Sequence, residues 1–101
     1  MSYQLIRQAV VAQRCLTAMY QGRVRHFSPH AIGQGNDGSE NVMGYQYAGE
    51  SSHPLPAGGE WRCFRVDGLS AVQQNSDPWH TRADHSRPNT CVTRIDVEVP
   101  H

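Results

Sequence analysis

Arginine and aromatic side chains recur in segments where strands are expected, and together they could bind an anionic ligand. The candidate ligand-binding set is Arg25, Arg62 and Arg65 with Tyr20, His26 and Tyr45. Guanidinium groups bind phosphate oxygens through paired hydrogen bonds, and aromatic rings stack on bases. This set therefore predicts a site for a nucleic acid or a nucleotide-like ligand. The alternative is that the arginines are solvated strand residues that pair with nearby carboxylates at little energetic gain.

A second group of polar side chains raises the question of metal binding or catalysis. Zinc needs three or four nitrogen or sulfur ligands, usually in closely spaced pairs, and the spacing here matches no such pair. A cysteine beside a histidine could act as a nucleophile, but no base and orienting group can be assigned. We therefore expect no metal, no cofactor and no enzymatic activity. The residues considered are His53, Cys63, His80, Asp84, His85 and Cys91, and ordinary loop histidines are the simpler interpretation.

The three cysteines, Cys15, Cys63 and Cys91, form an odd and widely spaced set. Small secreted domains carry an even and dense set, so we interpret these residues as buried free thiols in a reducing compartment. The N-terminal segment has no apolar signal core, and no apolar run approaches the ~20 residues that span a bilayer. The sequence thus predicts a cytoplasmic protein without a membrane partner.

The charge of the chain is balanced, with nine arginines, no lysine and nine acidic residues. A zero net charge argues against the uniform positive field that draws proteins onto duplex nucleic acid without sequence preference. Every fixed side-chain cation is a planar guanidinium, which suits bidentate contacts with anions. A length of 101 residues fits one domain, which we place over residues 1–101.

Apolar residues recur at helical spacing from about residue 3 to residue 14, which predicts one amphipathic helix. The barrel strands are expected within about residues 15–72. A hairpin over residues 15–27 turns at Gln21-Gly22, where Gly22 supplies a positive φ. Pro29 cannot donate to a β-ladder and should end the second strand or lie at an edge. Further strands are expected over about residues 41–47 and 61–67.

Residues 73–90 form a long polar segment without periodicity, which we interpret as a loop that is either functional or mobile. The last segment, residues 91–99, alternates apolar and polar residues and predicts a half-buried strand with Cys91, Ile95 and Val99 on its apolar face. This strand could pair within its own chain or add to the sheet edge of a neighbour. The second alternative predicts a homodimer through the C-terminal strand or another sheet edge.

The order of these segments resembles that of the WYL domain over about residues 3–72. Family members have an arginine two residues before an apolar residue and four before a proline, as do Arg25, Phe27 and Pro29 here. Near the end of this region they carry, in order, an arginine, a phenylalanine, an arginine, an aliphatic residue, an aspartate, a further arginine and an aliphatic residue. All but the further arginine are matched in this chain, at Arg62, Phe64, Arg65, Val66, Asp67 and Leu69.

The resemblance implies an SH3-like or Sm-like barrel with a leading helix, whose basic face binds nucleic acids or nucleotide-like ligands. Two positions depart from the family pattern. The Trp-Tyr-Leu tripeptide that names the family would fall near Glu40-Asn41-Val42, where only the aliphatic position is approximated. Gly68 stands where the family has a further arginine.

We therefore expect a mainly β domain, in which an N-terminal helix precedes a small antiparallel barrel or strongly bent sheet. The predicted function is a ligand-sensing or regulatory binding module for an anionic ligand. The alternative is a protein–protein interaction or oligomerisation subunit.

Overall fold

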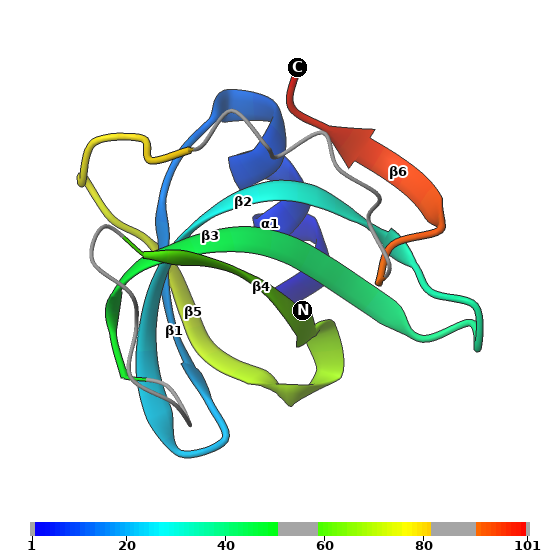
Figure 1. Ribbon diagram of the computed structural model, residues 1–101, viewed down its shortest axis with the longest axis horizontal. Coiled ribbons are helices and arrows are strands. Elements are labelled where there is room, and N and C mark those ends of the chain that lie inside the picture. Colours follow the sequence, from blue (N-terminus) through cyan, green and yellow to red (C-terminus); the bar gives the residue numbers. More distant parts are fainter. Residues whose placement is uncertain (1, 51–58, 82–90, 101) are drawn as a thin grey trace.

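The computed structural model describes residues 2–50, 59–81 and 91–100, and it consists of one helix packed on a curved β-sheet (Figure 1). Helix α1 spans Ser2–Ala12. A 3-10 turn, η1 (Val66–Gly68), separates the fourth strand from the fifth. The strands are β1 (Leu16–Tyr20), β2 (Arg23–Gln34), β3 (Glu40–Gly49), β4 (Glu60–Arg65), β5 (Leu69–Gln74) and β6 (Arg94–Glu98).

All strand pairs in this six-stranded sheet are antiparallel, in the order β4-β3-β2-β1-β5, with β6 added to β2. In the described part of the chain β4 and β5 stand at opposite ends of this order and do not pair, so the sheet is bent without closing. The predicted fold class is thereby confirmed. No helix among the described residues is long and apolar enough to cross a membrane.

Helix α1 ends two residues earlier than predicted, in a hydrogen-bonded C-terminal cap. Gln13 takes a left-handed backbone conformation with φ 55°. Its amide donates to the carbonyl of Val10, and the amide of Arg14 donates to the carbonyl of Ala9 at 2.9 Å. These two bonds form a Schellman motif, whose left-handed position is usually glycine. The cap stops the helix at Ala12, although helical apolar spacing continues beyond it.

Alternation along the strands gives the sheet an inner face that packs against α1 and an outer face that does not. The ring of Phe27 on β2 lies 4.7 Å from that of Phe64 on β4, across β3. Gly44 on β3 makes this contact possible, since a Cβ there would lie 2.7 Å from the Phe27 ring. Burial of each phenylalanine contributes roughly 1.5–3 kcal/mol. The core also contains Ile6, Ala9, Val10, Leu16, Ala18, Ile32, Val42, Val66, Leu69 and Val99.

The hairpin between β1 and β2 forms as predicted. Both residues of its two-residue turn have positive φ, 54° at Gln21 and 73° at Gly22. This combination is that of a type I′ turn, whose twist matches the twist of the flanking strands. The turn sets the register that pairs Tyr20 with Arg23 and Ala18 with Arg25.

Strand β2 does not end at Pro29, contrary to the first of the two predicted alternatives, but continues to Gln34. On one side β1 pairs with β2 as far as Phe27, and β6 pairs with it from Ala31 onward. Pro29 lies in the interval between these two partners, where an amide hydrogen is not required for either ladder. Its missing donor is thus tolerated in a strand that is buried along most of its length.

Strand β6 pairs within its own chain, lying antiparallel to the last residues of β2 (Figure 1). It is shorter than predicted, and the expected apolar face is only partly correct. Ile95 is 45% exposed, while Val99 just beyond the strand is buried. The physical reason is an irregularity in register between Ile32 and Gly33, which places two residues of β2 opposite Val97 and Ile95 and skips Asp96.

The cap of α1 leads to a prediction about stability. Replacing Gln13 by glycine removes the cost of holding a side chain in the left-handed region, so the free energy of unfolding should rise by about 1 kcal/mol. The same replacement at the exposed Gln8, inside the helix, should lower it by about 1 kcal/mol. Urea denaturation followed by circular dichroism measures both changes. Equal destabilisation by the two variants would contradict the proposed cap.

A second prediction concerns pH and the attachment of β6. Tyr3 donates to Asp96 at 2.7 Å and Arg7 at 3.1 Å, and these hydrogen bonds lower the pKa of Asp96. A lowered folded-state pKa stabilises the fold above the unfolded value of about 3.9, and the contribution disappears as the pH falls through the folded-state value. The difference in urea midpoint between the wild type and Asp96→Asn should therefore be largest near neutral pH and shrink below about pH 4. A difference that stays constant from pH 6 to pH 3 would argue against this role.

Candidate functional site

Three arginines gather at one end of the inner face, and we call Arg23, Arg25 and Arg62 the arginine cluster. In an antiparallel pair, residues opposite each other share a face. The pairing of Tyr20 with Arg23 and of Ala18 with Arg25 therefore puts both arginines on the face that carries Ala18 of the core. Arg62 lies two residues before the buried Phe64 on β4 and shares its face.

Arg25 occupies the centre of this region and is only 3% exposed. Its guanidinium carbon lies 5.4 Å from the centroid of the Tyr20 ring and 5.7 Å from that of Phe64. Its terminal nitrogens donate to Gln46 Oε1 at 3.3 Å and to the carbonyl of Tyr20 at 3.4 Å. In the described part of the structure, Nε has no hydrogen-bond partner. Arg25 is thus held by aromatic rings and neutral oxygens.

The electrostatic balance of the cluster favours an additional anion. Arg62 forms an ion pair with Glu60 at 2.9 Å, but no described carboxylate lies within ion-pair distance of Arg25. Burial lowers the pKa of Arg25, the positive charges of Arg23 and Arg62 lower it further, and Tyr20 and the carboxylate of Glu50 offset part of this effect. Because like charges in a partly desolvated region repel, an anion placed among them would remove part of that cost.

Gln46 supports Arg25 from the neighbouring strand. Its side chain is fully buried, accepts from Arg25, and donates through Nε2 to the carbonyls of Ala48 and Glu50. These bonds fix the end of β3, where the register with β2 shifts between His26 and Phe27. Sequence reasoning missed both Gln46 and Arg23. The alternation of Arg23 with Arg25 along one strand was a signal that could have identified Arg23.

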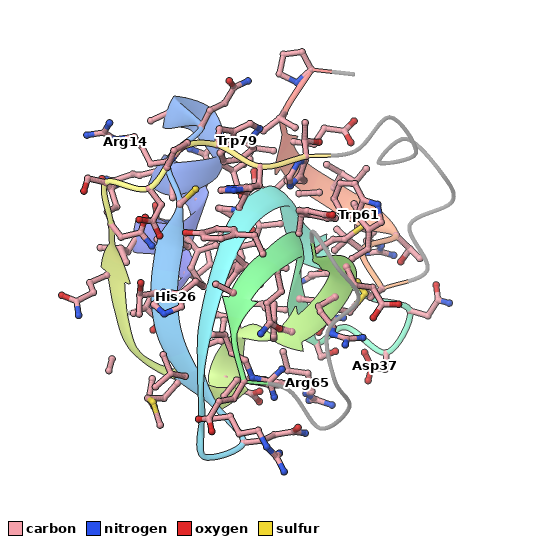
Figure 2. All side chains as sticks on the ribbon, turned by 60° about the vertical axis from the view of Figure 1, so that its left-hand side comes forward. Arg14, His26, Asp37, Trp61, Arg65 and Trp79 are labelled. Carbon is pink, nitrogen blue, oxygen red and sulfur yellow. A yellow bond between two sulfur atoms is a disulfide. The ribbon has the colours of Figure 1, made fainter. Side chains whose placement is uncertain are left out.

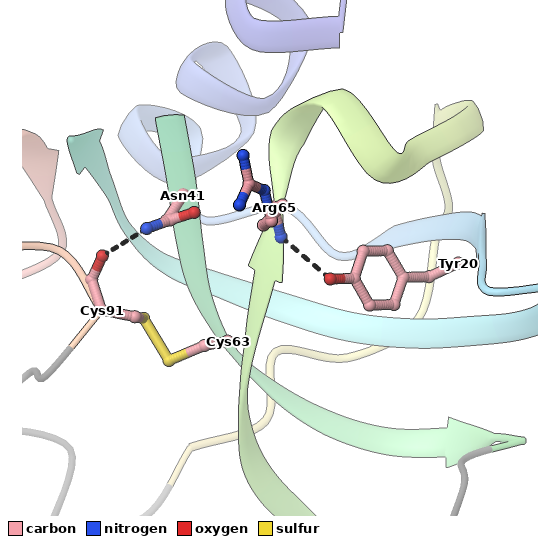
Figure 3. The surroundings of a disulfide bond; sticks show 5 residues. All are labelled: Tyr20, Asn41, Cys63, Arg65 and Cys91. Atoms are coloured by element: carbon pink, nitrogen blue, oxygen red, sulfur yellow. Dashed lines mark hydrogen bonds between the residues drawn. A yellow bond between two sulfur atoms is a disulfide. The ribbon is translucent and has the colours of Figure 1, made fainter. Parts of the chain in front are cut away.

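Arg65 does not join the arginine cluster, although the sequence grouped it with Arg25 and Arg62. It follows Phe64 on β4, so its side chain points to the outer face, where it is 56% exposed and pairs with Asp67 at 3.5 Å. Only its backbone amide approaches the inner region, donating to the hydroxyl of Tyr20 (Figure 3). Figure 2 shows Arg65 toward the same end of the molecule as Asp37.

His26 and Tyr45 also lie on the outer face, apart from Arg25. The Nδ1 atom of His26 is 2.9 Å from the hydroxyl of Thr17. Tyr45 is buried, and its ring packs edge-on against that of Trp61 at 5.1 Å. Of the six predicted residues, the structure therefore brings together Tyr20, Arg25 and Arg62.

The segment 75–81, which the sequence placed in the polar loop, crosses the outer face of the sheet. Tyr47 donates to Asp77 at 2.6 Å and stacks on His80 with 4.0 Å between ring centroids. Trp79 packs against the ring of His30 at 4.8 Å, and the His80 amide donates to the hydroxyl of Ser28. These contacts give Trp79 a structural role beside β2. The rest of the predicted loop, residues 82–90, lies outside the described residues.

Two of the three cysteines are bonded, which corrects the interpretation of all three as free thiols. Cys63 and Cys91 form a disulfide (Figure 3). Cys15 is a buried free thiol 3.2 Å from the hydroxyl of Ser28. The strand alternation that buries Phe64 turns Cys63 outward, where the segment leading to β6 meets it. Asn41 adds a hydrogen bond to the carbonyl of Cys91 at 2.7 Å. The odd cysteine count therefore no longer supports a reducing compartment.

The disulfide borders a shallow cleft of about 380 Å³ between Arg65 and the loop around Asp37. Hydrogen bonds from Ser39 lower the pKa of Asp37. The cleft is thus lined by a carboxylate, that of Asp37, and by a cation, the guanidinium of Arg65. Among the described residues, no group of three histidine, cysteine or acidic side chains could hold a metal ion. His53, Asp84 and His85 of the group considered for metal binding lie outside those residues.

Comparisons with protein-family models, with curated proteins and with solved structures found no match for this chain.

The contacts of Gln46 lead to a third prediction. Replacing Gln46 by alanine leaves a buried guanidinium nitrogen and two carbonyl oxygens without a side-chain partner. Because each buried unpaired polar group costs about 1–3 kcal/mol, we expect a loss of at least about 2 kcal/mol in the free energy of unfolding. Chemical denaturation measures it, with Gln73→Ala at an exposed position of β5 as the control, for which little change is expected. A neutral Gln46→Ala variant would show that Arg25 does not depend on this support.

Proposed function

We propose that this protein is a binding module for an anionic ligand, and that the ligand places a phosphate group at the arginine cluster. The observation that carries this proposal is a buried guanidinium, Arg25, flanked by two further arginines and bound among described residues only by neutral oxygens and aromatic rings. A phosphate offers several acceptor oxygens in the geometry that guanidinium groups bind best.

Access to the site is provided by the less buried members of the cluster. Arg23 is half-buried, and the side chain of Arg62 is 24% exposed. In this arrangement Arg23 and Arg62 contact the ligand, while Arg25 supplies positive charge from below and holds the ring of Tyr20. A ligand phosphate would compete with Glu60 for Arg62, an exchange that costs little because a partly exposed ion pair contributes only about 0–1 kcal/mol.

Nucleotides and short single-stranded nucleic acids are the ligand class that fits best. They combine phosphate groups with bases that can stack on aromatic rings, and Tyr20 lies at this end of the sheet. Membership of the WYL family stays a prediction, and it points to the same ligand class through Arg25 and Arg62. Arg65, which the resemblance includes, has no part in the proposed site because its side chain lies on the outer face.

A second candidate function is self-association through the C-terminal strand. It is favoured by the exposed side chain of Ile95 on β6, a strand that pairs only with β2 in the described structure.

The proposed function predicts a specific pattern of arginine variants. Arg23→Ala and Arg62→Ala should each weaken binding of a short fluorescent oligothymidylate by about tenfold, since a hydrogen bond to a charged group contributes about 1.5–3 kcal/mol. Arg65→Ala and Arg14→Ala remove a cation elsewhere and should change the affinity little. Fluorescence anisotropy at about 50 and about 200 mM salt measures these affinities, and the salt dependence should weaken in the first two variants.

Two outcomes would overturn this assignment. One is an affinity of the wild type that does not change with salt. The other is a loss of affinity in Arg65→Ala as large as that in Arg23→Ala. Titration with a nucleoside triphosphate in place of the oligonucleotide distinguishes a mononucleotide site from a site that needs several linked phosphates.

A further inference from the structure

We propose that the Cys63–Cys91 disulfide fastens β6 to its own chain, and that reduction of this bond allows β6 to exchange with the β6 of a second copy of the protein. The proposal concerns the end of β2 opposite to the arginine cluster, so it does not depend on the ligand proposed above. It rests on the second candidate function, self-association through the C-terminal strand, and adds how that association is controlled. It also rests on how β6 is held, on what its departure would uncover, and on the position of the disulfide.

Strand β6 fills a place in the sheet that no other described strand occupies. β1 pairs with the first part of β2, Arg23–Phe27, and β6 pairs with Ala31–Gln34 on the same side. If β6 left, the backbone groups of Ala31–Gln34 would become an open sheet edge next to α1. Such an edge is a template for another strand of matching sequence.

The place beside β2 is shaped for β6 in particular. Gly33 lets the two backbones approach, since a Cβ at this position would overlap the carbonyl oxygen of Arg94. Asp96 accepts hydrogen bonds from Tyr3 and Arg7 on α1, and the amide of Val99 donates to the carbonyl of His30. The strand of a second copy carries the same aspartate and the same backbone spacing, so it would form the same contacts. We therefore assign a second copy as the alternative occupant.

The side chains of β6 hold it less firmly than those of the central strands. Within the strand, Val97 is half-buried and the other four residues are exposed. The buried apolar anchors described at this end of the chain flank the strand, with Val92 before it and Val99 just beyond it. The departure of β6 would thus uncover less apolar surface than the loss of β2 or β3, so local opening of β6 is the less costly motion.

The disulfide is placed to prevent that departure. Cys91 lies shortly before β6 in the sequence, and its partner Cys63 is on β4 (Figure 3). The bond therefore ties the start of the C-terminal segment to a strand that β3 separates from β2. This tether keeps the local concentration of the chain's own strand far above that of any second copy. The side chain of Cys63 is exposed, so a small dithiol can reach the bond. When the disulfide is reduced, the dithiol is oxidised to its cyclic disulfide, and its two electrons and two protons convert Cys63 and Cys91 to thiols.

The exchanged dimer would keep the contacts of the monomer, because each β6 lies in an identical place on the other chain. The oxidised protein should therefore be a monomer, and the reduced protein should form a dimer whose fraction rises with concentration. Both thiols stay close in the dimer, but Cys63 of one chain then faces Cys91 of the other.

This juxtaposition gives a direct test. We mix Cys63→Ser with Cys91→Ser at high concentration, oxidise the mixture mildly, and separate it on a non-reducing gel with mass spectrometry of the linked peptides. If β6 exchanges, Cys91 of the first variant and Cys63 of the second form a covalent heterodimer. The matched control replaces one partner by Cys63→Ser/Cys91→Ser, which retains Cys15 and should yield no heterodimer.

A mixture in which the Cys63–Cys91 heterodimer is no more abundant than the Cys63–Cys63 and Cys91–Cys91 homodimers formed by random collision would overturn the proposal. A second measurement does not depend on these substitutions. Sedimentation of the wild type, oxidised and after treatment with a dithiol, should show a dimer that grows with concentration only in the reduced sample. A reduced wild type that stays monomeric at the highest attainable concentration, with circular dichroism confirming that it is folded, would equally exclude strand exchange.

Discussion

The structure depends on the burial of β2 on both of its faces. Its apolar side chains need packing partners on one face, and its polar side chains need hydrogen-bond partners on the other. A buried polar group without a partner lowers the stability by more than one satisfied hydrogen bond raises it. Phe27 meets the core beneath α1, while Ser28 and His30 bond to the segment that crosses the outer face. The other elements are arranged so that each part of β2 has a partner.

The two ends of β2 serve different purposes as a consequence. At its first end the chain turns back from β1, and the alternation that buries Phe27 also places Arg25 inward, where the core gives way to Gln46 and the rings of Tyr20 and Phe64. A cation in that position is costly unless an anion or neutral oxygens compensate it. The inward direction of Arg25 is therefore a requirement of the strand geometry, and its surplus of positive charge is what makes a binding role for this end physically reasonable.

At the other end, β2 changes partner from β1 to β6. Pro29 lies in the interval between the two ladders, and Gly33 allows the close approach of the last strand. Contacts that hold β6 come from elements distant in sequence: α1 through Tyr3 and Arg7, and β4 through the disulfide of Cys63. The last strand is thus attached by specific tertiary bonds more than by a large buried apolar surface.

The sequence by itself determined the features that depend on neighbouring residues. Helical spacing placed α1, the pair Gln21-Gly22 specified the first hairpin, and alternation within residues 91–99 predicted the last strand. It predicted the fold class and three members of the candidate site, Tyr20, Arg25 and Arg62. Tertiary structure alone decided that Cys63 meets Cys91, that β2 continues through Pro29, and that the arginines of β2 lie near Arg62 of β4. The reason is that periodicity fixes which way a side chain points within its own strand, whereas which distant segments lie side by side depends on the packing of the whole chain.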